Sequence, residues 1–338
     1  MVGRITAAFI GTALLATVAG LAAVAAEPME INIGGFLLPG SSSDALFKDY
    51  AKALSERSGG SLVPKLLIHG EAGSEEQVLA GLRRGRLNVG SVSALALSAL
   101  IPAMEVTKVP FLFDNVAEFD RIVDTVLLPE FEAMIADKDL TVVRWIDLGG
   151  LSLFGRTPLT TPEAVTGQRM RASSDQATQA FFTAVGADLV FVAAPELVPS
   201  LQTGLLDGGA ITTTAYAQTG LAGEAPHLTV TEHAYLGALL LANRSWLKGL
   251  PPEAATMVRD AFAGNDAIRR FFRAEAARLL ADSGARGFTV HRLSAGQRRA
   301  WAAAVAPSRD AIISASGDGG RALYAKIVAA RAAAQKQE

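Results

Sequence analysis

The 338-residue chain contains no cysteine. A protein without cysteine cannot form disulfides, use a thiolate nucleophile or hold a metal through thiolates. It also lacks the cysteine through which bacterial lipoproteins are anchored. Histidine is scarce as well, and none of the chain's four histidines stands in an H-x-x-x-H spacing that would pair two metal ligands. We therefore expect no metal and no cofactor. The histidines are His69, His227, His233 and His291.

An excess of charge of one sign is also lacking. The formal net charge is −2, 19% of the residues are charged, and no lysine and arginine tract interleaves with aromatic residues. Nucleic acids and anionic membrane surfaces are therefore not expected partners. Hydrophobic residues make up 50% of the chain, which is typical of a packed globular protein, and the length has room for two domains.

Familiar catalytic motifs are absent too. No serine stands in a G-x-S-x-G turn, and the glycine clusters at 207–209 and 317–320 do not follow a phosphate-loop or dinucleotide pattern. The adjacent acids Glu75 and Glu76 suit the first turn of a helix, where the helix dipole favours negative charge. We therefore do not expect an enzyme. Catalytic groups can assemble from distant positions, so an enzyme remains an alternative.

One long apolar run is present, at the N-terminus. Arg4 precedes an uncharged stretch over residues 5–26 that is rich in Ala, Gly, Leu and Val and ends in Val24-Ala25-Ala26. This pattern predicts a signal peptide over residues 1–26, cleaved after Ala26, and a mature protein in the periplasm. The stretch is also long enough to span a bilayer, so an uncleaved anchor is the alternative.

Strand and helix patterns alternate along the mature chain. Short apolar runs predict strands, and apolar residues at helical spacing between them predict helices. The opening β-α-β-α-β run is typical of a mostly parallel sheet with helices on both faces. A second α/β unit follows Gly149-Gly150, where we expect the chain to cross between two lobes. The predicted strands are 29–38, 62–68, 87–92, 141–146, 151–156, 168–171, 188–192, 208–212 and 235–242.

The C-terminal third is predicted to be helical. One amphipathic helix over 253–283 would measure about 45 Å at 1.5 Å per residue, long enough to lie across two lobes. We expect lobe 1 to comprise residues 27–149, with 236–270 returning to it. Lobe 2 is expected to comprise residues 150–235, with 271–338 packing on it.

Two arginines stand in an otherwise apolar, strand-like segment, Gly167-Gln168-Arg169-Met170-Arg171-Ala172. A guanidinium is always charged, and its planar fork matches a carboxylate with two parallel hydrogen bonds. Ligands of open α/β sheets bind at the carboxyl ends of strands, and Arg171 lies at such an end. Alternation places Arg169 and Arg171 on the same face of the strand, so periodicity alone does not choose between them. The alternative is that one or both are surface arginines of an edge strand.

Five short segments, in order along the chain, resemble the DctP-like solute-binding subunits of TRAP transporters (tripartite ATP-independent periplasmic transporters). The resemblance covers about residues 31–335. Its segments are Gly70-Glu71-Ala72-Gly73-Ser74-Glu75, Val109-Pro110-Phe111-Leu112-Phe113, Thr161-Pro162-Glu163 with Gly167-Gln168-Arg169-Met170-Arg171, Val185-Gly186-Ala187, and Leu201-Gln202-Thr203-Gly204-Leu205-Leu206-Asp207-Gly208.

The resemblance implies an α/β, two-lobed periplasmic binding protein fold with hinge strands and a long helix across both lobes. It implies that Arg171 grips the carboxylate of a small organic ligand, which the protein delivers to the small and large membrane subunits of a TRAP transporter. We expect a monomer. A ligand-presenting partner of a sensor kinase is an alternative role.

Further candidate ligand contacts follow from their positions: Glu71, Ser93, Thr212, Thr213 and Tyr216. Glu71 also fits a solvated loop, and Ser93 and Thr212 also fit helix N-caps.

Three departures from the family pattern predict a pocket that is less polar than usual. They lie at Gly150-Leu151-Ser152, where many members have an arginine, at Ile211, where an asparagine is usual, and at Ala194-Pro195-Glu196-Leu197-Val198, where both aromatic residues are lost. A monocarboxylate with an apolar or aromatic body therefore fits better than a polyhydroxylated sugar acid, because buried hydroxyls need partners.

Overall fold

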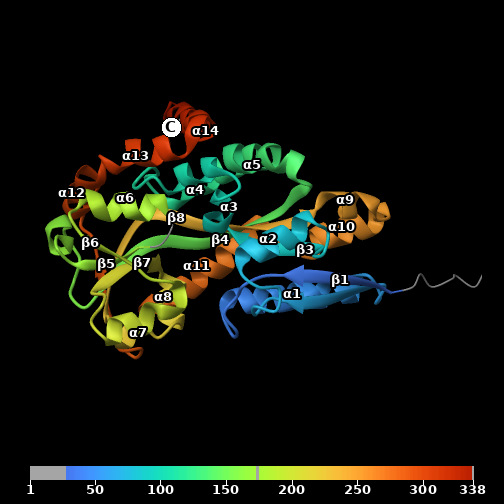
Figure 1. Ribbon diagram of the computed structural model, residues 1–338, viewed down its shortest axis with the longest axis horizontal. Helices are drawn as coiled ribbons and strands as arrows, with labels where there is room; N and C mark the ends of the chain where they lie inside the picture. Colours follow the sequence, from blue (N-terminus) through green and yellow to red (C-terminus); the bar gives the residue numbers. More distant parts are fainter. Residues whose placement is uncertain (1–27, 173–174, 337–338) are drawn as a thin grey trace, which may run out of the picture.

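The computed structural model describes residues 28–172 and 175–336, so the predicted signal peptide, residues 1–26, lies outside the described part. The strands form one mixed sheet in the order β2-β1-β3-β8-β4-β7-β5-β6, with β9 paired to β8. Figure 1 shows two groups of elements joined by long strands. The strands are β1 (Met29–Gly34), β2 (Leu62–Leu67), β3 (Val89–Ser93), β4 (Leu140–Gly155), β5 (Arg169–Ala172), β6 (Asp188–Phe191), β7 (Gly208–Thr212), β8 (His227–Asn243) and β9 (Thr289–Arg292).

The first group contains the parallel strands β2, β1 and β3 with α1 (Ser42–Arg57) and α2 (Glu75–Arg83). The predicted β-α-β-α-β run is confirmed. Local chemistry explains the helix starts: Ser41 accepts a hydrogen bond from the Asp44 backbone N–H, and Ser74 and Gln77 form a capping box. The second group contains the parallel strands β7, β5 and β6 with α6 (Gln176–Ala184), α7 (Leu197–Gln202) and α8 (Thr213–Gln218).

Two long antiparallel strands, β4 and β8, join the groups. The prediction of separate strands over 141–146 and 151–156 is wrong, because β4 runs unbroken past Gly149. The ladder instead shifts register between Asp147 and Gly149, and Gly149 has φ 92°. Glycines in a strand often mark such a bulge rather than a loop. The predicted strand 235–242 is likewise too short, since β8 begins at His227.

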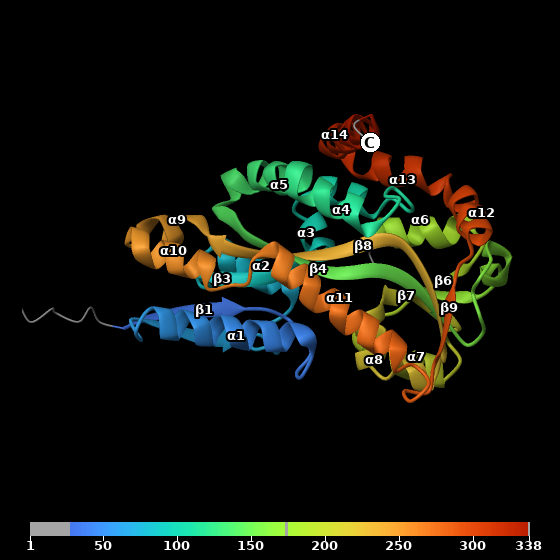
Figure 2. The same ribbon diagram turned by 180° about the vertical axis from the view of Figure 1, so that it is seen from behind.

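The prediction of one helix over 253–283 is also wrong. The structure has α10 (Pro252–Asp260) and α11 (Asn265–Ala281), separated by a short connection. Phe262 in that connection is buried, with its ring 5.3 Å from Phe47 and 5.0 Å from Tyr50. Gly264 then has extended backbone and starts α11. The free energy gained by burying the Phe262 ring thus exceeds what an unbroken helix would gain here. It is α11 that crosses the long strands, on the face of the sheet turned to the viewer in Figure 2, and it packs against β4 and α8.

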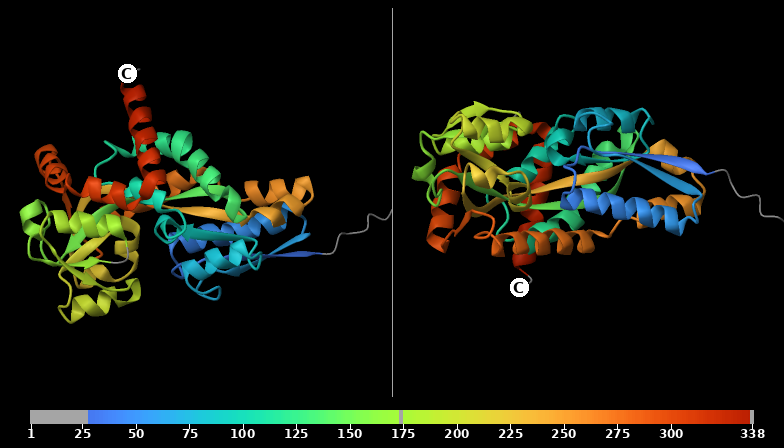
Figure 3. Two further views of the ribbon diagram at one scale, coloured as in Figure 1. Left: turned by 45° about the horizontal axis from the view of Figure 1, so that its top comes forward. Right: turned by 90° about the horizontal axis from the view of Figure 1, so that it is seen from below.

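The remaining helical elements cover the faces and the C-terminal end. Helices α12 and α13 contact α6, whereas α14 contacts η1 and α4 and extends outward in Figure 3. The lobe boundaries expected from the sequence remain a prediction. None of the helices in residues 28–172 and 175–336 is long and apolar enough to cross a membrane. The elements are α3 (Ala94–Ser98), η1 (Pro102–Lys108), α4 (Val116–Ile122), α5 (Leu128–Ile135), α9 (Arg244–Gly249), α12 (Ala295–Val305), α13 (Ser308–Ala315) and α14 (Gly317–Gln335), with short 3₁₀ or π turns between some of them.

Candidate functional site

A cavity of about 340 Å³ lies between the two groups of elements. The ends of β3, β5 and β7 and the segment that follows β1 reach it, and ligands of open α/β sheets bind at such strand ends. Half of its described lining residues are apolar, and Arg171 and Asp175 are the only charged side chains among them. The lining residues are Phe36, Leu37, Leu38, Ser41, Ser42, Ser43, Ser93, Leu95, Leu148, Leu151, Arg171, Asp175, Thr178, Ala210, Ile211, Thr212, Thr214, Ala215, Gln218, Thr219, Leu236 and Phe272.

The two arginines of the strand motif have different surroundings. Arg169 is exposed and bound to Asp207 through two parallel hydrogen bonds, Nε to Oδ2 at 2.9 Å and Nη2 to Oδ1 at 2.7 Å. Arg171 is half-buried, lines the cavity and donates from Nε to the Val192 carbonyl at 3.1 Å. Burial lowers the pKa of Arg171, but an arginine starts so high that it stays protonated at neutral pH. Arg171 is therefore the arginine of this segment that lines the cavity.

Asp175 connects the cavity to a buried ionic cluster. It caps α6, accepting from the Ala177 backbone N–H at 3.1 Å and from the Thr178 hydroxyl at 2.6 Å. Lys108 Nζ donates to Asp175 Oδ1 at 2.7 Å and to Glu105 Oε1 at 3.0 Å. Burial alone would raise the pKa of Asp175, but the Lys108 ammonium lowers it on balance. Asp175 is therefore ionised at neutral pH.

Ser93 and Thr212, both expected near a ligand, line the cavity. Both also cap helices: Ser93 Oγ accepts from the Ala96 N–H at 3.2 Å, and Thr212 Oγ1 accepts from the Ala215 N–H at 3.4 Å. The Ser93 hydroxyl donates its proton to the Glu75 carboxylate at 2.7 Å, so this proton is not available to a ligand. Ser93 is thus placed to accept, rather than donate, a further hydrogen bond.

The other three expected contacts lie elsewhere. Glu71 is exposed in a separate depression beside α2, and its carboxylate accepts from the His69 N–H at 2.7 Å. Thr213 lines a different pocket, next to Gly149 and Gly150. Tyr216 is fully buried in the core, and its hydroxyl donates to the Ala225 carbonyl at 2.7 Å. The structure does not bring these three residues to the cavity.

Several lining residues were missed by sequence reasoning. Asp175 and Thr178 follow Arg171 closely, and the run Ser41-Ser42-Ser43 follows the first strand, so their position at strand ends was a usable signal. Gln218 does not follow a strand directly, so its position in the sequence does not indicate that it lines the cavity. Its side-chain amide donates to the Ser42 hydroxyl at 3.1 Å, which links α8 to the start of α1 across the cavity.

Some of the positions that depart from the family pattern line the cavity. Leu151 and Ile211 both line the cavity. Ser152 does not; it is fully buried, and its hydroxyl has no hydrogen-bond partner among the described residues. Two positions expected to carry arginine and asparagine in the family pattern thus present aliphatic side chains here.

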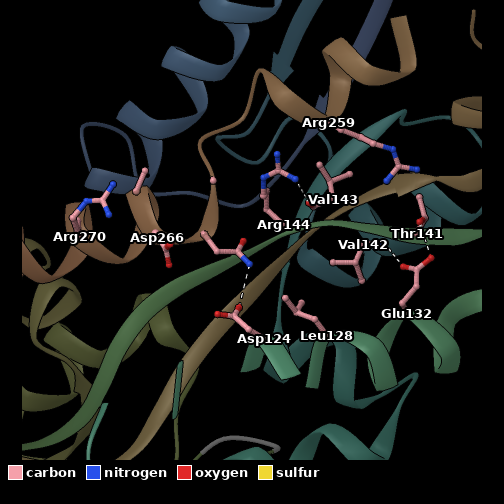
Figure 4. Close-up of a pocket in the computed structure, with 13 residues that line it drawn as sticks. Asp124, Leu128, Glu132, Thr141, Val142, Val143, Arg144, Arg259, Asp266 and Arg270 are labelled. Atoms are coloured by element: carbon pink, nitrogen blue, oxygen red, sulfur yellow. Dashed lines mark hydrogen bonds between the residues drawn. The ribbon is translucent and has the colours of Figure 1, made fainter. Parts of the chain in front are cut away.

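A larger cavity, about 890 Å³, lies between the start of β4 and the junction of α10 and α11 (Figure 4). Its acids are already paired: Asp124 binds Arg269 at 2.7 Å, and Glu132 binds Arg244 at 2.8 Å. Arg144 Nε donates to the Ala263 carbonyl at 3.2 Å. The smaller cavity instead lies at the ends of the strands, where ligands of open α/β sheets bind, so we regard it as the candidate ligand site.

Comparison with known proteins gives consistent matches. Residues 39–315 match the sequence profile of DctP, bacterial extracellular solute-binding protein, family 7. A solute-binding protein of Chromohalobacter salexigens is 26% identical over 210 residues, which is 62% of each chain. The C4-dicarboxylate-binding periplasmic protein DctP of Rhodobacter capsulatus is 24% identical over 316 residues, covering 91% of this chain and 93% of that one.

Among solved structures, the sugar acid binding protein DctPAm of Advenella mimigardefordensis, in complex with galactonate, superposes with a TM-score of 0.81. The two are 22% identical, and the match covers 90% of this chain and 99% of that one. This likeness confirms the predicted two-lobed α/β fold.

Proposed function

The chain belongs to the DctP family of bacterial extracellular solute-binding proteins, family 7, and we propose that it captures a small organic carboxylate between its lobes for a TRAP transporter. In this proposal the loaded protein delivers its ligand to the small and large membrane subunits. It acts outside the cytoplasm as a monomer and is not an enzyme.

The cavity position of Arg171 carries the proposal. Arg171 is the only cation among the described lining residues. Within the described part of the chain its guanidinium makes one hydrogen bond, from Nε to the Val192 carbonyl. Its guanidinium can therefore offer Nη donors to a carboxylate in the bidentate geometry that arginine favours. Arg169 lacks this freedom because Asp207 already occupies it.

Closure of the lobes follows from the residues on either side of the cavity. One wall comes from the segment after β1 and the start of α1, including Ser42, and the other from β5, β7 and α8, including Arg171 and Gln218. A ligand that touches both walls stabilises the closed arrangement more than the open one, and only such a difference shifts the equilibrium. The Ser42–Gln218 hydrogen bond is a contact available only when the walls are close.

The wall favours a ligand with an apolar body. Leu151 and Ile211 contribute no hydrogen-bonding groups where the family pattern carries arginine and asparagine. Hydroxyls placed against them would lose their water partners without replacement, which costs free energy. We therefore propose a monocarboxylate with an apolar or aromatic body, although relatives include proteins named for a C4-dicarboxylate and for 2,3-diketo-L-gulonate.

A thermal-shift screen followed by calorimetry tests this function. The panel comprises benzoate, phenylacetate, 4-methyl-2-oxopentanoate, succinate, D-galactonate and D-glucuronate. An acid that binds raises the melting temperature in proportion to RT ln(1 + [L]/Kd). Arg171→Ala should weaken binding by at least about 30-fold, as expected when one partner of a buried charge pair is removed. Arg171→Lys should recover part of the affinity, since it restores charge without the fork.

Arg169→Ala is the matched control, since it removes an arginine two residues away that Asp207 already occupies. It should leave affinity unchanged. Full affinity in Arg171→Ala would contradict the assignment, and preference for the two sugar acids over the apolar acids would contradict the ligand class. Mass spectrometry of the acid that co-purifies, recovered intact, argues against turnover. Light scattering of the purified protein tests the monomeric state.

The role in signalling is a second candidate for the same binding event. A protein that presents its ligand to a sensor kinase would use the same cavity and the same Arg171. Uptake of labelled acid by vesicles carrying the membrane subunits, dependent on this protein, would favour transport.

A further inference from the structure

A buried cluster of ionisable groups lies directly behind one wall of the cavity. It consists of Glu105 and Lys108 in η1 and of Asp175 at the start of α6, which are 6%, 3% and 7% exposed. Lys108 bonds both acids, at 3.0 Å to Glu105 and 2.7 Å to Asp175. One buried cation therefore serves two carboxylates, and this trio by itself has one negative charge in excess.

Arg171 supplies the positive charge that balances the excess negative charge of the trio. Arg171 and Asp175 both line the cavity, and the negative charge of Asp175 acts favourably on the Arg171 guanidinium. With Glu105 ionised, the four groups carry two positive and two negative charges. A ligand carboxylate at Arg171 adds a third negative charge in a region where little water screens it. Buried groups respond to such an excess by changing protonation rather than by holding the charge.

Glu105 is the member of the cluster best placed to take up a proton. Its Oε1 accepts from Lys108, but its buried Oε2 has no hydrogen-bond partner among the described residues. Asp175 instead accepts from Lys108, from the Ala177 N–H and from the Thr178 hydroxyl. Protonating Asp175 would weaken several bonds, whereas protonating Glu105 at Oε2 breaks none of these.

The electrostatics of the cluster agree with its geometry. Burial raises the pKa of Glu105, and the nearby Asp175 charge raises it further, against the lowering effect of Lys108. The Ser98 hydroxyl on α3 also faces Glu105 and lowers its pKa. From β8, His233 is kept neutral, because burial lowers its pKa to about 3.

In the part of the chain that the structure describes, the other elements packed against η1 bring no charged side chain into the cluster. The charged side chains of α13 and of the facing turns of α14 are exposed, and those of α14 further along pair with the α4 and α5 regions. The exposed ones are Arg309, Asp310, Asp318, Arg321 and Lys326.

We propose that binding of a carboxylate at Arg171 is coupled to the uptake of one proton by Glu105, an inference that rests on the proposed function. The bound ligand adds negative charge near Asp175, so Glu105 holds a proton more tightly in the complex than in the free protein. By linkage, protonation of Glu105 then strengthens ligand binding by the same factor. Affinity therefore falls as pH rises between the Glu105 pKa of the free protein and that of the complex.

Calorimetry in buffers of different ionisation heat tests the coupling. The probe is the acid of the panel above that binds the wild-type protein most tightly. Titrations in phosphate and in Tris at the same pH, between pH 5.5 and 8, report the protons taken up per acid bound. We expect uptake that approaches one proton within this range. We expect a Kd that weakens by up to about tenfold per pH unit where uptake is greatest.

Glu105→Gln is the informative variant because it keeps the shape of the side chain and removes its titration. It should bind the same acid with no proton uptake and with a Kd that no longer depends on pH. Glu132→Gln is the matched control: Glu132 is paired to a basic side chain, Arg244, as Glu105 is to Lys108, but it lies outside the cluster and the cavity. The control should keep the wild-type uptake.

Three outcomes would overturn the proposal, and they are distinguishable. Equal binding enthalpies for the wild-type protein in the two buffers, after subtraction of the heats of dilution, would show that the acid binds without proton uptake. Uptake that persists in Glu105→Gln would assign the proton to another acid, such as Glu75 beside Ser93. Failure of every acid to bind the wild-type protein would overturn the proposed function itself, and the coupling with it. The first outcome needs no variant and holds even where Glu105→Gln does not fold.

Discussion

Replacing Lys108 with methionine should destabilise this protein strongly, because it removes the cation that two buried carboxylates share. Lys108 is 3% exposed and bonds Glu105 at 3.0 Å and Asp175 at 2.7 Å. Breaking a buried ion pair by removing one partner costs about 3–5 kcal/mol, because the other charge stays buried without compensation. For a chain of this size that corresponds to a fall in melting temperature of about 5–8 °C.

The loss should depend on pH in a definite direction. Without the ammonium, the folded-state pKa values of Glu105 and Asp175 lie above those of the unfolded chain. Between the unfolded and folded values the native state binds more protons, so stability falls as pH rises. The deficit of Lys108→Met relative to the wild type should be smallest near pH 5, where protonation relieves the charge, and largest near pH 8.

Two further variants separate the charge effect from simple loss of packing. Lys108→Met/Asp175→Asn keeps a helix cap at position 175 but removes its charge, so it should regain part of the lost stability. Lys65→Met removes a lysine from an exposed pair with Glu30, at 3.4 Å, and should hardly change the melting temperature. Melting curves from pH 5 to 8 by circular dichroism provide the measurement. A deficit in Lys108→Met below about 1 kcal/mol, or one that does not change with pH, would refute the reasoning.

Three other substitutions test the fold around the cavity. Phe262→Ala removes the ring that packs between α10 and α11 against Phe47 and Tyr50, and should cost about 3–5 kcal/mol in chemical denaturation; a neutral result would contradict its role in dividing the helices. Tyr216→Phe leaves the buried Ala225 carbonyl without its donor and should cost about 1–3 kcal/mol, with unchanged affinity for the acid in calorimetry. Gly237→Ala places a methyl group where the Trp145 ring lies, and should lower the melting temperature and alter the near-ultraviolet circular dichroism of tryptophan.

The elements that could be predicted from the sequence are those whose causes are local. Ser41 and Ser74 lie directly before their helices and cap them, so the early β-α-β-α-β run follows from neighbouring residues alone. The failures have long-range causes. Gly149 was expected to lie between two strands, at a crossing between lobes, yet pairing of β4 with β8 on one side and β7 on the other carries one strand through a bulge there. Phe262 was expected inside a helix, yet its burial against α1, some two hundred residues earlier, interrupts that helix.

The same distinction applies to the site. A short apolar strand with two arginines points to a carboxylate site, but alternation places both arginines on one face and cannot rank them. Asp207, 38 residues further along, decides between them, since its carboxylate binds Arg169 and leaves Arg171 to the cavity. Lys108, 67 residues before Asp175, similarly fixes the charge state behind Arg171. The chemical role of the motif therefore depends on the acids that the fold brings beside it. Asp207→Asn should for that reason loosen Arg169 without transferring ligand binding to it, since Arg169 lies at the opposite end of β5 from the cavity.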